Sequence, residues 1–304
     1  MRIAVTGASG FVGGAVATAL ADRDHEVVGF GRDPNGWSHP RARYRSWDFV
    51  GGPLLGDRDF DAVVHCAALV DETAPRAEAM RINRDGTRTV IRSFRTTRFV
   101  HLSSAAVYDN LGANVEVTES QAGGTALCGY SESKAAAELE FAGTDFVILR
   151  PRAVYGPGDA LLIPRILGQV RRGRLALPEG SEVRQTLTSL PNLVRAVECA
   201  LRPGAPTGVY NVGDDTPVLL SAVLRELLAR KGMGHVRITP VPFRAAFAAA
   251  TALERTAALA RRRPGTTRFA VAQFGRERTL DLTAARERLG FRPRPTSLDG
   301  AERW

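Results

Sequence analysis

Two side chains four positions apart, those of Tyr130 and Lys134, could together move a proton. A compact ammonium beside a phenol favours the phenolate and lowers its pKa, whereas the planar guanidinium of Arg holds its proton to very high pH. The chain has 41 basic residues, yet Lys occurs only at positions 134 and 231, so Lys134 is a candidate for a role that Arg cannot fill. A Tyr and a Lys on any exposed helix face would match the same pattern, so the rest of the chain must decide.

Three glycines near the N-terminus, Gly7, Gly10 and Gly13, give the Tyr–Lys pair its context. They follow a short buried strand predicted at 2–6 and precede an apolar helix and a second strand predicted at 26–30. Such a strand–turn–helix–strand unit is the setting in which a glycine turn binds a dinucleotide, because the backbone can approach the pyrophosphate and the helix N-terminus offers free N–H groups. We therefore expect a bound dinucleotide; a Rossmann fold that binds nothing is the alternative.

The spacing Gly-x-x-Gly-x-x-Gly, together with Tyr130-x-x-x-Lys134, resembles the extended short-chain dehydrogenase/reductase family over nearly the whole chain. Residues 61–68 resemble its fourth strand, and residues 101–108 resemble its fifth strand with the catalytic Ser/Thr position at Ser104. Residues 149–159 resemble the crossing into the substrate domain and, with the C-terminal tail, are similar to the 3β-hydroxysteroid dehydrogenase-like branch.

Strands and helices alternate up to about residue 150, which predicts an α/β fold with a doubly wound parallel Rossmann sheet. The resemblance adds a smaller, mainly helical C-terminal substrate domain. We expect the NADP-binding domain to span 1–160 with a return segment at about 184–213. The substrate-binding cap then comprises 161–183 and 214–304.

The resemblance implies a catalytic group of Ser104, Tyr130 and Lys134. Ser104 would hydrogen-bond the substrate oxygen, Tyr130 would exchange a proton with it, and Lys134 would bind the nicotinamide ribose and tune Tyr130. The chemistry is a hydride moved between nicotinamide C4 and a carbinol carbon. The expected cofactor-binding residues are Gly7, Ser9, Gly10, Phe11, Val12, Gly31, Arg32, Asp48, Phe49, Cys66, Ala67, Ala68, Asn83, Tyr130, Lys134 and Pro151.

Gly31 and Arg32, at the end of the second strand, favour NADP(H) over NAD(H). An acidic residue there would bind the ribose 2′-hydroxyl and repel a 2′-phosphate. Gly31 instead leaves room, and Arg32 supplies a planar cation suited to phosphate. Arg32 could also be an ordinary surface arginine.

The residues after Ser104 separate the reactions that the family carries out. Dehydratases of the family typically have an Asp-Glu pair there, whereas this chain has Ala105 and Ala106, which disfavours dehydration. Epimerases retain NAD and so favour the acidic residue that Gly31 replaces. We predict an NADPH-dependent ketoreductase of specialised metabolism that acts on a bulky ketone, polycyclic ketones included. A sugar-nucleotide epimerase and a catalytically silent NADP-binding regulator are the alternatives.

The expected cap contains an alanine-rich amphipathic stretch at about 243–260, followed by Arg261, Arg262 and Arg263. Its apolar face, with Phe243, Phe247 and Leu253, could touch a membrane surface or cover an apolar substrate pocket; we favour the pocket. Arg184 argues against an apolar pocket, since relatives can use an Arg near there to hold a nucleotide diphosphate.

Composition excludes several other classes of protein. The net charge is +9, but the arginines are scattered and no nucleic-acid recognition motif accompanies them. The sequence contains no run of about 18 apolar residues, so we expect no membrane span. The N-terminal strand leaves no room for a signal peptide. Cys66, Cys128 and Cys199 are odd in number and lack metal spacing, so we expect reduced thiols, no metal and a cytoplasmic protein.

The resemblance also implies a homodimer. Family members commonly pair the helix near 77–95 and the helix that begins near Tyr130 with their symmetry mates. The apolar residues available for this contact are Ala79, Ile82, Val90, Ala135, Ala136 and Leu139. The same side chains could instead face the sheet.

Overall fold

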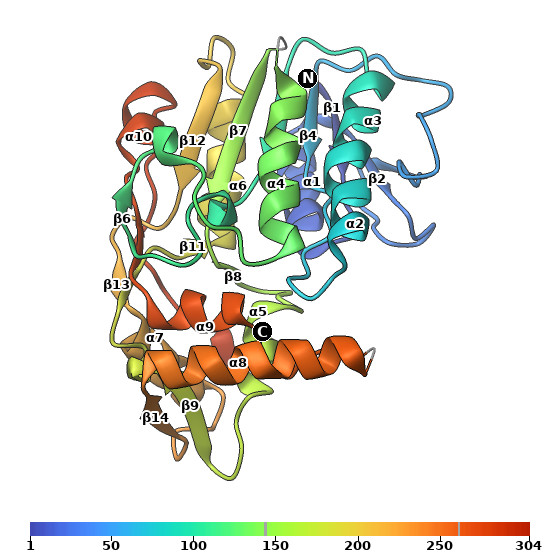
Figure 1. Cartoon of the computed structure of the whole chain (residues 1–304). Coiled ribbons are helices and arrows are strands. Elements are labelled where there is room, and N and C mark those ends of the chain that lie inside the picture. Colours follow the sequence, from blue (N-terminus) through green and yellow to red (C-terminus); the bar gives the residue numbers. More distant parts are fainter. Residues whose placement is uncertain (143–144, 261) are drawn as a thin grey trace.

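A seven-stranded parallel sheet forms the centre of the molecule in the computed structural model, which describes residues 1–142, 145–260 and 262–304. The strand order is β12-β7-β5-β4-β1-β2-β3 (Figure 1). The strands are β1 (Arg2–Thr6), β2 (Glu26–Gly31), β3 (Arg43–Ser46), β4 (Ala62–His65), β5 (Phe99–Leu102), β7 (Phe146–Pro151) and β12 (Gly208–Val212). The central strands are almost entirely buried, because helices cover both faces of a parallel sheet. The predicted doubly wound fold is confirmed.

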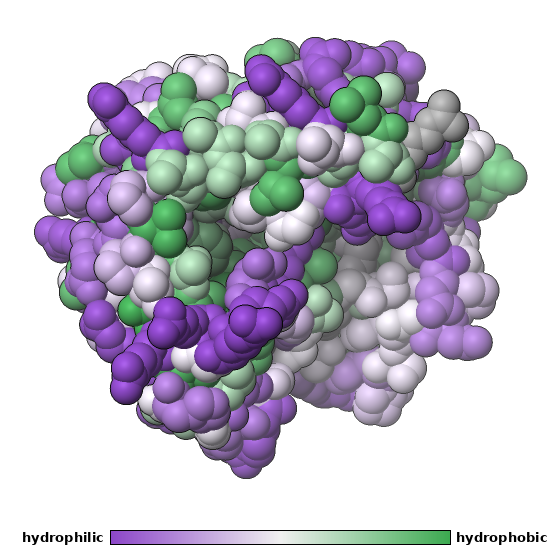
Figure 2. All heavy atoms as spheres, turned by 60° about the horizontal axis from the view of Figure 1, so that its bottom comes forward, coloured by the Kyte–Doolittle hydropathy of each residue, from purple (hydrophilic) through white to green (hydrophobic). Residues whose placement is uncertain are grey.

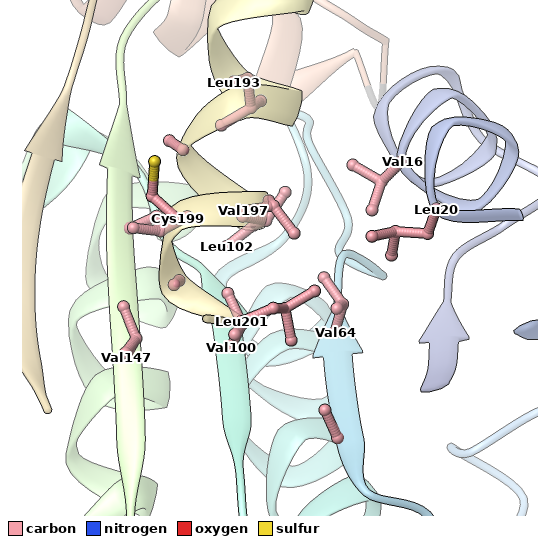
Figure 3. Close-up of a cluster of buried hydrophobic side chains, with 14 of the residues drawn as sticks. Val16, Leu20, Val64, Val100, Leu102, Val147, Leu193, Val197, Cys199 and Leu201 are labelled. Carbon is pink, nitrogen blue, oxygen red and sulfur yellow. The ribbon is translucent and has the colours of Figure 1, made fainter. Parts of the chain in front are cut away.

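Helices pack on both faces of this sheet (Figure 1). One face carries α1 (Phe11–Asp22), α6 (Leu190–Ala200) and α10 (Thr283–Arg288); the other carries α2 (Arg76–Ala79), the π-helical turn η1 (Met80–Asp85), α3 (Gly86–Ser93) and α4 (Gly129–Glu138). Figure 3 shows the core of the first face, where Leu20 of α1 and Val197 of α6 converge on Val64 of β4 and Val100 of β5.

The end of the chain completes this same core. Ala285 of α10 and the following Leu289 and Phe291 belong to the hydrophobic cluster that contains α1 and α6, and Phe291 is fully buried. Helix α10 also contacts the edge strand β12. The nucleotide-binding half of the fold therefore contains residues from both ends of the sequence.

The sheet has a switch point at its middle. Strands β2 and β3 lie on one side of β1, whereas β4, β5 and β7 lie on the other, so the loops after β1 and β4 diverge. In open α/β sheets, ligands bind in the crevice that this divergence leaves at the carboxyl ends of the strands. The glycine turn follows β1, and residues 66–68 follow β4, so both lie at this crevice.

A second, mainly helical group of elements lies beyond the carboxyl ends of the strands (Figure 1). Its helices are α5 (Leu162–Leu167), α7 (Leu220–Arg230), α8 (Phe243–Leu259) and α9 (Arg268–Gly275). Its small sheets pair β9 (Arg174–Pro178) with β14 (Arg237–Val241), β8 (Val154–Tyr155) with β11 (Thr188–Ser189), and β10 (Arg184–Gln185) with β13 (Val218–Leu219) and β15 (Arg278–Leu280), which also pairs with β6 (Asn114–Val117). We call this group the cap; the predicted domain boundaries stay a prediction.

Candidate active site

A cavity of about 350 Å³ is lined both by residues at the carboxyl ends of the strands and by the cap. The predicted site residues that line it are Phe11, Val12, Cys66, Ala68, Ser104, Tyr130, Lys134 and Pro151. The cap contributes mostly apolar side chains, among them Ile163 of α5, Leu224 of α7 and Phe274 of α9. Figure 2 shows a hollow at this end of the molecule, bordered by hydrophilic side chains and with hydrophobic ones beside it.

The glycine turn has no room for a side chain at Gly7 or Gly13. A Cβ at Gly7, where φ is 76°, would lie 2.7 Å from the backbone nitrogen of Ala67, and a Cβ at Gly13 would lie 2.1 Å from the Gly7 carbonyl oxygen. Gly10, at the N-cap position before α1, offers no side-chain cap, so the first N–H groups of the helix remain available to an anion. The turn therefore fits the pyrophosphate of a dinucleotide.

Tyr130 lies in the first turn of α4, partly buried, with its side chain at the cavity. Burial raises the pKa of the Tyr130 hydroxyl to about 12, and a side-chain hydrogen bond with Ser104 opposes this rise. Lys134 is not among the groups that shift this pKa here, since its ammonium donates to the Leu102 carbonyl oxygen, and its tuning of Tyr130 stays a prediction. Tyr130 therefore keeps its proton at physiological pH and is a donor.

Lys134 is buried one turn further along α4, with 2% of its surface exposed. Its Nζ donates to the Leu102 carbonyl oxygen at 2.6 Å and lies 3.4 Å from Nε2 of His101. Burial lowers the pKa of Lys134 to about 8, while Glu138 opposes the effect. An arginine at this position would stay charged, whereas Lys134 can lose its proton near physiological pH.

Two histidines form a neutral layer beside Lys134. The rings of His65 and His101 stack with their centroids 5.1 Å apart. The ring nitrogens of His65 hydrogen-bond with the hydroxyls of Thr6 at 2.7 Å and Thr87 at 3.0 Å. Burial, with Lys134 adding to it, lowers the pKa of His65 to about 3 and the pKa of His101 well below its usual range. Neither ring competes with Lys134 for a proton at neutral pH.

Glu138, a further turn along α4, attaches this helix to the sheet. Its two carboxylate oxygens accept hydrogen bonds from Nε and Nη2 of Arg150 at 2.9 and 2.6 Å, and Ser103 donates to it as well. The ion pair is buried, with side-chain exposures of 4% for Arg150 and 10% for Glu138. Sequence analysis missed Glu138, although its spacing of four from Lys134 places it on the same helix face.

Ser104 and Asn83 shape the surroundings of Tyr130. The Ser104 hydroxyl accepts a hydrogen bond from the Ala106 backbone N–H at 3.1 Å, which orients it at the end of β5. Asn83 lies on the π-helical turn η1 and donates to the Leu69 carbonyl oxygen at 3.0 Å and to the Ser133 hydroxyl at 2.9 Å. Asn83 thus connects the loop after β4 to α4, and such π-bulges are frequent at functional sites.

The predicted 2′-phosphate pocket is more crowded than the sequence suggests. A Cβ at Gly31 would lie 2.6 Å from both the Ser9 and the Tyr44 hydroxyls, so these side chains fill the room that glycine leaves. Arg32 is exposed, and Asp48 is exposed while the adjacent Phe49 is packed into the core. A side chain at position 31 would therefore have to displace the Ser9 and Tyr44 hydroxyls.

The amphipathic helix does not line the cavity. The lining residues include none of Phe243, Phe247 and Leu253, because α8 packs its apolar face on α9 and α9 faces the cavity. Leu253 is 44% exposed. Arg261, in the basic cluster after α8, lies outside the described residues.

Arg184 and two of the proposed dimer residues also lie elsewhere than expected. Arg184 is exposed and does not line the cavity, whereas the adjacent Gln185 does. Ala79 and Val90 are fully buried against the rest of the chain and cannot reach a partner, whereas Leu139 is 77% exposed. The homodimer stays a prediction.

Comparison with known proteins decides the family. Residues 3–213 match the model of the NAD dependent epimerase/dehydratase family. The chain belongs to this epimerase/dehydratase family. Its members with similar sequences include the 4-hydroxy-2-methyl-3-oxo-4-farnesyl-3,4-dihydroquinoline-1-oxide ketoreductase of Stigmatella aurantiaca, which is 31% identical over 99% of this chain and 95% of the relative. The 2-alkyl-3-oxoalkanoate reductase of Stenotrophomonas maltophilia is 30% identical over 100% of this chain and 98% of the relative.

The steroid-dehydrogenase branch is represented too. A 3-beta-hydroxysteroid dehydrogenase of Mycolicibacterium neoaurum is 26% identical over 78% of this chain and 73% of its own. Among solved structures, MoeE5 in complex with UDP-glucose and NAD superposes with a TM-score of 0.71 at 23% identity, covering 99% of this chain and 96% of that one, which shows a shared fold. As a member of the family, the chain is an NAD(P)-dependent oxidoreductase that acts on an alcohol or a ketone.

Two further observations bear on partners. The described residues contain no group of three or more His, Cys, Asp or Glu that could hold a metal ion. Among the helices that the structure describes, none has the length and apolarity needed to cross a membrane.

Proposed function

We propose that this enzyme is an NADPH-dependent ketoreductase whose catalytic residues are Ser104, Tyr130 and Lys134. The observation that carries the proposal is the Tyr130 hydroxyl, kept protonated by burial and hydrogen-bonded to Ser104 at an apolar cavity. A neutral phenol can give its proton to the oxygen of a ketone as that oxygen gains negative charge. The names of the two full-length relatives, both reductases, support a ketone substrate.

Each residue has a defined part in this reaction. A reduced nicotinamide, when bound, supplies the hydride. Tyr130 donates a proton to the substrate oxygen, and Ser104 holds that oxygen beside the phenol. Lys134, which lines the same cavity, would bind the nicotinamide ribose, and Glu138 and Arg150 hold the helix that carries it.

A substrate with a bulky, apolar body fits the cap better than a sugar nucleotide. Sugar-nucleotide epimerisation is the second candidate, because MoeE5, which shares the fold, is solved in complex with UDP-glucose and NAD. However, Arg184, which could hold a diphosphate, is exposed away from the cavity, and α5, α7 and α9 offer mainly Leu, Ile, Val and Phe. Competition binding with NADP present, using UDP- and dTDP-sugars against polycyclic aromatic and steroidal ketones, tests the choice. Micromolar binding of a sugar nucleotide with inert ketones would favour the epimerase.

The decisive variant is Tyr130→Phe, which removes the proton donor and keeps the ring. We expect NADPH oxidation with a reactive ketone to fall by about 10² to 10⁴ while NADPH binding is retained. Tyr210→Phe is the matched control, since its hydroxyl donates to backbone carbonyl oxygens of Pro206 and Thr207 and Tyr210 does not line the cavity. Near-normal turnover by Tyr130→Phe would show that another group carries the proton.

A further inference from the structure

Two buried arginines line the cavity without a salt bridge. Arg152 is 8% exposed and Arg278 is 2% exposed. The ion pairs among the described residues include neither of them. Charges buried to this degree are normally paired, because an isolated one is costly to remove from water. Arg150, close in sequence, has such a partner in Glu138.

Arg152 has N–H groups that its two hydrogen bonds do not use. Its Nη1 donates to the Thr186 carbonyl oxygen and its Nη2 to the Gln273 side-chain oxygen, both at 3.1 Å, and both acceptors are neutral. A guanidinium has five N–H groups, so these two bonds leave others free. Burial, together with the like charge of Arg278, lowers the pKa of Arg152 to about 9.

Arg278 adds positive charge to the same wall of the cavity. Its Nη1 and Nη2 donate to the carbonyl oxygens of Asp109 and Asn110, both at 2.6 Å, and its buried Nε has no hydrogen-bond partner. The Asp109 carboxylate lies near enough to act on Arg278 electrostatically, but its oxygens accept backbone N–H groups of the surrounding loop. The carboxylates that also line the cavity, Asp71, Glu72 and Asp159, are bound to other groups, so Arg152 and Arg278 are free of an ion-pair partner that would compete with an entering anion.

We propose that Arg152, with Arg278 beside it, binds a carboxylate of the substrate, so that the ketone is an oxo acid with an apolar body. The inference rests on the proposed ketoreductase function. A carboxylate matches the planar fork of a guanidinium through two parallel hydrogen bonds. The Leu, Ile, Val and Phe side chains of α5, α7 and α9 would cover the rest of such a molecule, whereas a nucleotide diphosphate also carries a polar base.

The test uses two probes that contain no ketone and have the same apolar chain, one ending in a carboxylate and the other in a neutral amide of similar size. Titration calorimetry with NADP present compares decanoate with decanamide. We expect the wild-type protein to bind decanoate at least about tenfold more tightly, as a charge-assisted bond predicts. Arg152→Met should abolish this preference, Arg152→Lys should keep part of it, and Arg184→Met, which alters an exposed arginine outside the cavity, should leave it unchanged.

Equal affinities for the two probes in the wild-type protein would overturn the proposal, as would a preference that survives in Arg152→Met. Tighter binding of UDP-glucose than of decanoate would also overturn it, in favour of a diphosphate. Circular dichroism establishes whether Arg152→Met is folded; if it is not, the wild-type comparison and Arg152→Lys decide. No hydride transfer enters these measurements, so failure of the ketoreductase assignment would appear separately, as absence of NADPH oxidation with every ketone.

Discussion

Tyr130 and Lys134 hold their protons with very different strength. With pKa values of about 12 and about 8, the phenol stays protonated at neutral pH and the ammonium stays charged. A protonated phenol can donate at once to a reduced oxygen, whereas alcohol oxidation would first require its proton to leave. At the scale of single residues, this is the protonation state that the proposed reduction requires of Tyr130.

The pH dependence should follow Lys134. Its pKa of about 8 lies below the ordinary value of 10.5, so the side chain is charged below pH 8 and neutral above it. We expect kcat/KM for the ketone to be flat from about pH 6 to about pH 8 and then to fall by up to about tenfold per pH unit. His65 and His101 are neutral throughout this range and add no step.

A matched pair of variants assigns this step. Lys134→Met should be slow and should lack the alkaline fall, whereas Lys231→Met should reproduce the wild-type profile, because Lys231 donates to the carbonyl oxygen of Trp304 away from the cavity. A wild-type profile that stays flat to pH 10 would contradict the role of Lys134.

Cofactor preference should depend on Arg32. Because Arg32 is exposed, Arg32→Ala should leave the fold intact. We expect its kcat/KM with NADPH to fall roughly tenfold through loss of a charge-assisted phosphate contact, and its kcat/KM with NADH to change little. Arg43→Ala, at an exposed position of the edge strand β3, serves as the control. Gly31→Asp is a less direct test, since its Cβ would displace the Ser9 and Tyr44 hydroxyls. Wild-type turnover with NADH as fast as with NADPH would refute the assignment.

Among the elements, α4 is the one whose placement matters most, because it carries both Tyr130 and Lys134. The buried Glu138–Arg150 pair fixes its far end to β7, and Asn83 ties its first half to the loop after β4 through Ser133. The helix is thus held at two points, one on each side of Lys134.

Breaking the buried pair should be costly. Glu138→Gln keeps the shape and leaves the Arg150 charge without its partner, so we expect a loss of about 3–5 kcal/mol in the free energy of unfolding. Glu140, two residues after Glu138, forms a more exposed ion pair with Arg88. Glu140→Gln breaks this pair and should lower the free energy of unfolding by no more than about 1 kcal/mol. Urea unfolding of both variants provides the comparison. Equal losses would mean that the buried pair contributes no more than a surface pair.

At the scale of the whole molecule, the assembly state can be measured directly. We expect a homodimer at micromolar concentration, by light scattering, with the exposed Leu139 in the contact. Leu139→Glu should then lower the mass to that of one chain. A monomer mass for the wild-type protein would exclude the dimer.

The parts of the structure that follow from short stretches of sequence could be predicted, and those that depend on distant contacts could not. The glycine turn and the Tyr130–Lys134 spacing are local, so they indicated the fold and the candidate site. The sequence predicted that α8 has an apolar face. A periodic pattern does not indicate which element packs on that face, and in the structure it is α9. Arg152 resembles any other arginine until its burial without a carboxylate is seen.

The contribution of Ala285, Leu289 and Phe291 to the core beside α1 and α6 has a consequence for how the protein is made. While the ribosome is still adding the residues after Thr283, the apolar surface that Phe291 will cover is open to water. Contacts between segments so far apart form late and slowly, because a long loop must close first. Until these residues have emerged and docked, the dinucleotide-binding half lacks part of its core, and chaperones and proteases have most access to it at that stage.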